Sequence, residues 1–158
     1  MWIMMYLSYF LMVTSFISLV IWGVIEYLSV NFLSMNHIQF SLIASILYMF
    51  TQTLIMFYFI ATGKNIKEFI INNKLDINNY KKVLSMKMKL FPHIMVNMVI
   101  LGTVFIIGGA IFSNIISEWQ YAVLFFICIF HYTYLLIIQH DCFKVNTELV
   151  IKLYKLSK

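Results

Sequence analysis

The sequence predicts an all-α membrane protein, a four-transmembrane-helix bundle with an amphipathic helix in the cytoplasmic loop between helices 2 and 3. The first observation is composition: 63% of the 158 residues are hydrophobic and only 11% are charged, too few charges to cover a water-exposed surface. The second is that the apolar residues gather into four runs of about twenty, the length of a membrane-crossing helix. The third is that lysine lies in only two segments of the chain.

The four apolar runs are expected to be spans at about residues 2–23, 38–62, 91–112 and 119–140. At about 1.5 Å per residue, each run is long enough to cross a hydrocarbon core of roughly 30 Å. Trp2 and Trp22 mark the ends of the first run and Trp119 opens the fourth, as expected where aromatic rings lie among headgroups. Residues 1–158 are therefore expected to form a single membrane domain, with a short inner tail at 141–158.

Lysine placement predicts the orientation of the spans. The eleven lysines are the only Lys or Arg residues of the chain, and all lie between the second and third spans or after the fourth. The connections around Glu26 and Glu118 contain none. By the positive-inside rule, both termini are expected on the cytoplasmic or matrix side of a bacterial or organellar inner membrane.

The lysine-rich loop, residues 64–90, is predicted to contain a basic amphipathic helix. Apolar residues recur there at helical spacing, and the remaining positions carry candidate lipid-headgroup ligands: Lys81, Lys82, Lys87 and Lys89. Such a helix is typical of a segment that lies on an anionic leaflet of the bilayer, and docking on a partner subunit is the alternative. Nucleic acid is a poor fit as a partner, because the lysines alternate with membrane-seeking residues and no arginine is present.

Local signals predict where the helices around this loop begin and end. Asp76 or Asn78 can cap the amphipathic helix. Pro92 is expected in the first turn of the third span, where a missing N–H is tolerated. The sequence Thr62-Gly63-Lys64 is interpreted as a helix C-cap followed by an inner-face anchor.

Histidine is the residue type here able to ligate haem iron, and two of the four histidines are expected at the same depth. His93 is expected about ten residues before the middle of the third span, and His140 about ten after the middle of the fourth. Both would lie roughly 15 Å inside the membrane centre. They are therefore candidate axial ligands of haem b, and the alternative is a pair of hydrated interfacial histidines.

Gln52 in the second span and His131 in the fourth are polar residues expected near the middle of the membrane. Side chains of this kind face other helices or a cofactor, because lipid offers them no hydrogen bond. The sequence predicts that the two form a central polar pair, and a proton or quinone contact of His131 is the alternative. Stripes of small residues are interpreted as helix-packing faces: Ser8, Ser15, Ser18, Ser41, Ser45, Gly102, Gly109 and Ser113.

No catalytic residue and no further metal site are expected. The six acidic residues divide between the two faces of the membrane, so none lies at mid-membrane, where a cation-coupled transporter would keep one. Cys128 and Cys142 cannot bridge each other along a helix, and both are expected as free thiols.

The stretch MFYFIATGKNIKE at residues 56–68, with Phe91-Pro92 and Gly108-Gly109-Ala110 further on, resembles uncharacterised small bacterial four-helix integral membrane proteins. The resemblance covers roughly the last two-thirds of the chain, with alanine at position 61 where glycine is expected. It implies the four-helix topology and a bacterial origin, and no activity.

Three classes of function follow from these expectations. The first is a small non-catalytic subunit or assembly factor of a larger inner-membrane complex, such as a respiratory one, whose partners are the bilayer and other membrane subunits or further copies of the chain. The second is a b-type haem or quinone-associated electron-transfer anchor that uses His93 and His140. The third is a small channel or transporter that depends on Gln52 or His131. The first needs no site, so the protein is not expected to be an enzyme.

Overall fold

A computed structural model describes residues 2–28, 37–76, 78–111 and 117–156. They form four helices: α1 (Trp2–Leu28), α2 (His37–Asn72), α3 (Asn78–Ile111) and α4 (Glu118–Leu156). Each helix is long and apolar enough to cross a membrane, so the prediction of an all-α protein with four such helices is confirmed. Three residues of the sequence predictions lie outside the described ranges: Phe112 at the end of the third expected span, Ser113 of the packing stripe and Lys158 of the expected tail.

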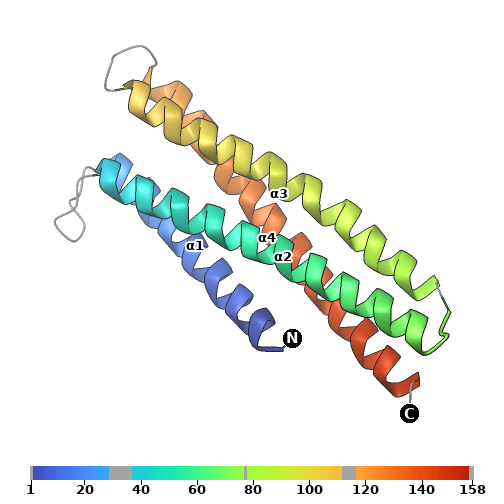
Figure 1. Ribbon diagram of the computed structural model, residues 1–158. Helices are drawn as coiled ribbons and strands as arrows, with labels where there is room; N and C mark the ends of the chain where they lie inside the picture. Colours follow the sequence, from blue (N-terminus) through green and yellow to red (C-terminus); the bar gives the residue numbers. More distant parts are fainter. Residues whose placement is uncertain (1, 29–36, 77, 112–116, 157–158) are drawn as a thin grey trace.

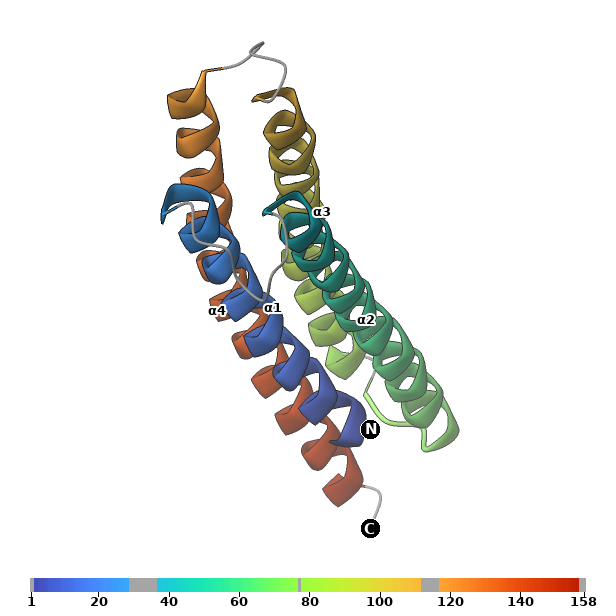
Figure 2. The same cartoon turned by 90° about the vertical axis from the view of Figure 1, so that its left-hand side faces the viewer.

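The four helices run antiparallel to their chain neighbours in one bundle (Figure 1, Figure 2). α1 packs against α2, α2 against α3 and α3 against α4, while α1 also contacts α4 and closes the bundle. The start of α1, the end of α4 and the turn between α2 and α3 lie at the same end of the bundle (Figure 1). The lysines gather at this end, which we call the inner end, and the opposite end is called the outer end.

A seven-residue repeat of buried positions explains this packing. The two buried rows of α4 are Tyr121, Cys128, Leu135, Cys142 and Leu149, and Phe125, Tyr132, Gln139, Asn146 and Leu153. The matching rows of α2 are Ser41, Tyr48, Ile55 and Thr62, and Ser45, Gln52, Phe59 and Ile66. A period of about 3.5 residues keeps one stripe of a helix against its partners over its whole length, as in left-handed bundles. The opposite faces are exposed and apolar, as a lipid-facing surface requires.

The helices are longer than the expected spans, which changes the inner loop. Residues 64–72 continue α2 and residues 78–90 open α3, so a separate amphipathic helix over 64–90 is not confirmed. α4 runs to Leu156, where a short tail from 141 onward was expected. The physical reason is that the buried repeat continues past the most hydrophobic runs, through Ile66, Ile70, Val83, Met86, Leu149 and Leu153.

The lengths of the helices differ from the thickness of a bilayer. α2, α3 and α4 contain 36, 34 and 39 residues. At about 1.5 Å per residue they are roughly 50 to 60 Å long, against roughly 40–45 Å for a bilayer with its headgroups. α1, with 27 residues, is about 40 Å long. If the bundle stands across a membrane, three of its helices extend beyond the headgroups.

The C-terminus of α2 is closed by a Schellman cap. Lys74 has a left-handed φ of 51°. The Leu75 N–H donates to the Ile70 carbonyl at 3.0 Å, and the Lys74 N–H donates to the Ile71 carbonyl at 3.2 Å. The expected C-cap at Gly63 was therefore wrong, and the helix ends ten residues later, after Asn72.

Asp76 caps the start of α3, as one of the two predicted alternatives. Its carboxylate accepts a hydrogen bond from the Asn78 N–H at 2.9 Å and a second from the Asn78 side-chain amide at 3.1 Å. These bonds stabilise the ionised form, so they hold the pKa of Asp76 below its usual range. The turn between α2 and α3 is thus defined by a cap on each side.

Two residues that were expected at helix ends lie inside helices. Pro92 is in the interior of α3 and not in a first turn. Gly63 is in the interior of α2, where an added Cβ would come 2.6 Å from Nζ of Lys87 and 3.0 Å from Val83. Glycine at this position therefore serves the close approach of α2 and α3.

Candidate functional site

Polar side chains are buried between the helices of the described bundle: Ser8, Ser15, Ser41, Ser45, Thr51, Gln52, Thr62, Asn97, Gln139 and Asn146. Three of them, on α3 and α4, form the centres of hydrogen bonds between helices. From the outer to the inner end we call these the Asn97, Gln139 and Asn146 levels. Gln139 and Asn146 are seven residues apart, about 10 Å along α4.

Asn97 joins three helices at the first level. The Tyr48 hydroxyl of α2 donates to Oδ1 of Asn97. Nδ2 of Asn97 donates to the Cys128 carbonyl of α4 at 3.3 Å and lies 2.9 Å from Nδ1 of His131. Because Nδ2 only donates, Nδ1 of a neutral His131 accepts, and the ring proton lies on Nε2. Both polar atoms of this fully buried amide are therefore engaged in contacts between helices.

His93 lies beside His131 on the flank of the α3–α4 pair. The two ring centroids are 5.9 Å apart, and the Tyr134 ring is 5.5 Å from that of His93. Both histidines are partly exposed and Tyr134 is exposed. The structure thus brings together two imidazoles that were not paired from the sequence.

His140 lies elsewhere, against α1. Its Nδ1 is 3.0 Å from the Tyr9 hydroxyl, and it stands nine residues beyond His131, about 13 Å along α4. At this level α3 presents Met86 and Lys89, which line a groove together with Asp141.

The predicted depth match between His93 and His140 is therefore corrected. His93 is level with His131, and His140 is level with the part of α3 around Met86. The packing of the longer helices, and not the distance of each residue from the middle of an expected span, sets which residues of α3 and α4 are level.

Gln52 pairs with Gln139 at the second level. Nε2 of Gln139 donates to Oε1 of Gln52 at 2.6 Å, and both side chains are completely buried. The predicted bond between Gln52 and His131 does not form, because His131 bonds to Asn97 and lies about 12 Å further toward the outer end of α4 than Gln139. Both central polar residues do contact other helices, as expected, but with different partners.

The third level joins α2 to α4, and a further bond joins α1 to α4. Nδ2 of Asn146 lies 3.2 Å from the Tyr58 hydroxyl. The Ser15 and Tyr132 hydroxyls are 2.6 Å apart. The sequence interpretation missed Tyr132, Gln139 and Asn146 as polar core residues. Their spacing of seven residues along α4 is the signal that identifies them.

The chemistry available to these groups is limited. Among the described residues, no group of three or more His, Cys, Asp or Glu side chains is placed to hold a metal ion. Cys128 and Cys142 are free thiols and both are buried. A hydrogen bond between membrane helices stabilises the association by about 0.6 kcal/mol on average. The three levels are thus suited to setting helix partners and register.

The candidate headgroup ligands lie on the first turns of α3, at the inner end. Lys81, Lys82 and Lys89 are exposed, while Lys87 is partly buried where it crosses Gly63. Their contact with lipid headgroups stays a prediction.

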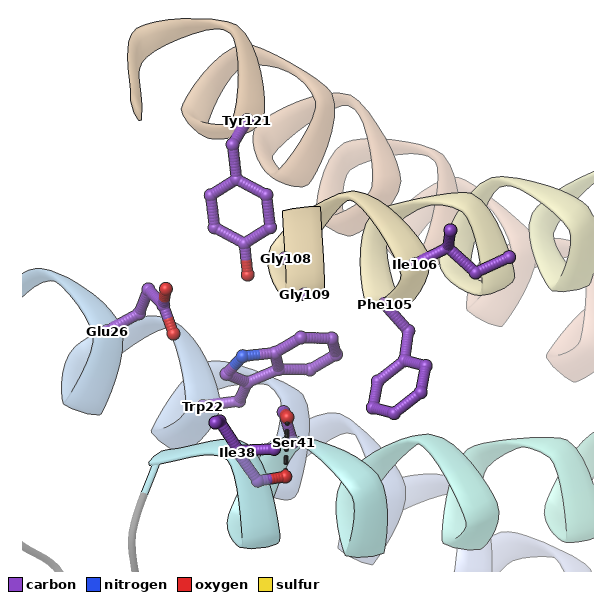
Figure 3. Close-up of a pocket in the computed structure, with 9 residues that line it drawn as sticks. All are labelled: Trp22, Glu26, Ile38, Ser41, Phe105, Ile106, Gly108, Gly109 and Tyr121. Atoms are coloured by element: carbon purple, nitrogen blue, oxygen red, sulfur yellow. Dashed lines mark hydrogen bonds between the residues drawn. The ribbon is translucent and has the colours of Figure 1, made fainter. Parts of the chain in front are cut away.

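A cavity of about 180 Å³ lies at the outer end, between the α1–α2 and α3–α4 pairs. Figure 3 shows the side chains of Trp22, Phe105 and Tyr121 around it, with the carboxylate of Glu26 beside Trp22. An added Cβ at Gly109, which also lines the cavity, would meet nothing within 4 Å. The sequence interpretation treated Glu26 only as an acid of the outer connection and did not expect this cavity.

Comparison with known proteins gives no match: no family model fits the chain, and neither a curated protein nor a solved structure matches it. The resemblance to small bacterial four-helix membrane proteins therefore stays a prediction.

Proposed function

We propose that the protein is a non-catalytic integral membrane scaffold, a small subunit or assembly factor of a larger membrane complex. The observation that carries this proposal is the set of hydrogen bonds that Asn97 makes to other helices. This fully buried polar side chain of α3 has both polar atoms bonded to neighbouring helices, through Tyr48, Cys128 and His131. A side chain used in this way stabilises the bundle and has no free group for substrate chemistry.

The surface of the bundle supports the same proposal. Each helix presents large apolar side chains to the outside at middle positions, for example Phe10, Phe57, Val99 and Phe130, which are 61–80% exposed. Lipid or the helices of a partner can cover such faces. The lysine-rich helix ends extend from the inner end, where they are available to anionic headgroups or to an acidic surface of a partner.

Site-specific photo-crosslinking in native membranes tests the proposal. A photoreactive amino acid is placed at Phe10, Phe57, Val99 or Phe130, one position on each helix, and at the buried Leu135 as a control. A scaffold is expected to give one recurring protein adduct from at least one exposed face and none from Leu135. The adduct is then expected to co-migrate with the protein in a mild-detergent complex of constant stoichiometry.

The opposite result is equally clear. If all four exposed positions react only with lipid, and the folded protein leaves the membrane as a monomer, the scaffold proposal is contradicted. Lipid adducts at the four positions show in the same experiment that the photoreactive group was active and reached the bilayer.

A second candidate function, a b-type electron-transfer anchor, is favoured by one observation, the 5.9 Å separation of the His93 and His131 rings. Two imidazoles from neighbouring helices are a common axial ligand set for haem iron. The bond from Asn97 opposes this function, since it leaves the proton of a neutral His131 on Nε2, the nitrogen left to bind iron. A visible absorption band that disappears in His93→Ala and His131→Ala but not in His140→Ala would favour the anchor over the scaffold.

A further inference from the structure

The cavity at the outer end combines three aromatic side chains with one carboxylate. Trp22 comes from α1, Phe105 from α3 and Tyr121 from α4, and Figure 3 shows all three directed toward the same space. Trp22 and Tyr121 are almost completely buried, at 1% and 3% exposure. Glu26 lines the same cavity from one turn further along α1.

We propose that this cavity binds a small organic ammonium ion, either a free amine or the headgroup of a lipid. Aromatic rings attract a cation over their faces through the ring quadrupole, and the attraction is strongest where water is excluded. A carboxylate at the edge supplies the opposite charge, and methyl groups on the nitrogen find apolar walls. Cages of aromatic side chains are a general device for quaternary ammonium recognition.

The size of the cavity suits such a ligand. Its volume of about 180 Å³ exceeds the roughly 150 Å³ that is sufficient for a benzene-sized molecule. Choline has about seven non-hydrogen atoms and benzene about six, so the two molecules are of similar size and choline would fit in this volume. Gly108 and Gly109 form part of the wall, and the open space over Gly109 would be filled by a larger side chain. We therefore expect a large side chain at position 109 to compete with a ligand for this space.

The charge balance at the outer end favours a cation. The described ends of the helices there carry Glu26 and Glu118, and no lysine lies among these residues. All ten described lysines lie at the inner end or along the helix segments that lead to it. Among the described residues, a cation at the outer end thus meets two carboxylates and no lysine, which favours a cation over an anion.

Tryptophan fluorescence tests this proposal directly. Replacing Trp2 and Trp119 with phenylalanine leaves Trp22 as the single tryptophan, because the chain has three. The protein is reconstituted in phosphatidylglycerol vesicles, which contain no ammonium group, and titrated with choline chloride. We expect a saturable change in Trp22 emission. The neutral isostere 3,3-dimethyl-1-butanol, which has carbon in place of the charged nitrogen, is expected to give none.

Two pairs of variants connect the signal to the cavity. Glu26→Gln is expected to weaken choline binding at least about tenfold, which corresponds to about 1.4 kcal/mol. Glu118→Gln removes the same charge at the same end of the bundle from an exposed position outside the cavity, and is expected to leave the affinity unchanged. Gly109→Leu is expected to abolish binding, whereas Thr103→Leu, on an exposed face of α3, is not.

Vesicles of phosphatidylcholine distinguish the two sources of the ligand. If lipid headgroups occupy the cavity, Trp22 begins at its ligand-bound emission and choline adds no further change. If the ligand is a free amine, the titration is the same as in phosphatidylglycerol.

Three results would overturn the proposal: no choline response in phosphatidylglycerol, an equal response to the neutral alcohol, or equal effects of Glu26→Gln and Glu118→Gln. Should the single-tryptophan variant fail to fold, isothermal titration calorimetry of the unmodified chain with choline and the alcohol gives the same decision.

Discussion

Nδ2 of the fully buried Asn97 in α3 lies 2.9 Å from Nδ1 of the partly exposed His131 in α4. The apolar rows around this pair repeat every seven residues, so apolar packing alone would tolerate a shift of one helix past another by two turns. The hydrogen bond between the buried Asn97 amide and His131 has no equivalent in the shifted arrangement, and it therefore specifies register. The Gln139 and Asn146 levels add hydrogen bonds between α4 and α2.

Removing one member of the glutamine pair is expected to cost more than removing both. In Gln139→Leu, Oε1 of Gln52 stays buried and loses its donor, so the free energy of unfolding should fall by about 1 to 3 kcal/mol. In the double variant Gln52→Leu/Gln139→Leu, both amides leave and stability should return close to the original. Circular dichroism during titration with sodium dodecyl sulfate measures both. Exposed Gln120→Leu is the control, and a double variant no more stable than the single one would contradict this prediction.

Two glycine-to-alanine changes are expected to act in opposite directions. A Cβ at Gly23 would come 2.8 Å from the Phe125 ring, which is itself held against Trp22, so Gly23→Ala should destabilise the bundle by about 1 to 3 kcal/mol. A Cβ at Gly109 meets nothing within 4 Å, so Gly109→Ala should stabilise α3 by about 0.5 to 1 kcal/mol. The same unfolding titration compares them. Equal effects of the two changes would be inconsistent with the packing described.

A further pair of variants tests the role of the left-handed residue in the α2–α3 turn. Lys74→Gly removes the steric cost of a φ of 51° and should raise stability by about 1 kcal/mol. Lys82→Gly, which removes the same charge inside α3, should lower stability by about 1 kcal/mol. Thermal unfolding of both variants in the same detergent measures whether each change raises or lowers stability. A loss of stability in Lys74→Gly would contradict the assignment of the cap.

Accessibility of introduced cysteines tests the orientation. In a variant in which Cys128 and Cys142 are replaced by alanine, single cysteines are placed at Lys81 and Lys155 of the inner end, and at Gln120 of the outer end. In intact cells, a membrane-impermeant maleimide is expected to label position 120 and neither of the other two. After the membrane is permeabilised, all three should react. Labelling of position 81 in intact cells would reverse the predicted topology.

The number of helices could be predicted from the sequence because a run of about twenty apolar residues is a local signal. The ends of the helices were harder to predict from the sequence. The α2 helix continues past Gly63 because Ile66 and Ile70 occupy buried positions, although lysines lower the local hydropathy. Only the packing of α2 on α3 explains why these residues stay helical.

Predicting which residues contact one another requires the register of the helices, and no single segment of the sequence determines that register. Gln52 was expected to pair with His131, and its partner is Gln139 instead, eight residues further along α4. The expectation depended on a membrane centre that the sequence defines only loosely. The His93–His140 pairing failed for the same reason. The outer cavity could not be predicted at all, since its walls come from four helices and are level with one another only after packing.

A double-mutant cycle between Asn97 and His131 tests most directly the central claim that the interior polar side chains hold the helices together. The free energy of unfolding is measured for Asn97→Ala, His131→Ala and the double variant, with Asn97→Ala and exposed Thr133→Ala as the control cycle. The structure predicts a coupling energy of about 0.6 to 1.7 kcal/mol for the first cycle and none for the control. A coupling energy of zero between Asn97 and His131 would contradict the claim.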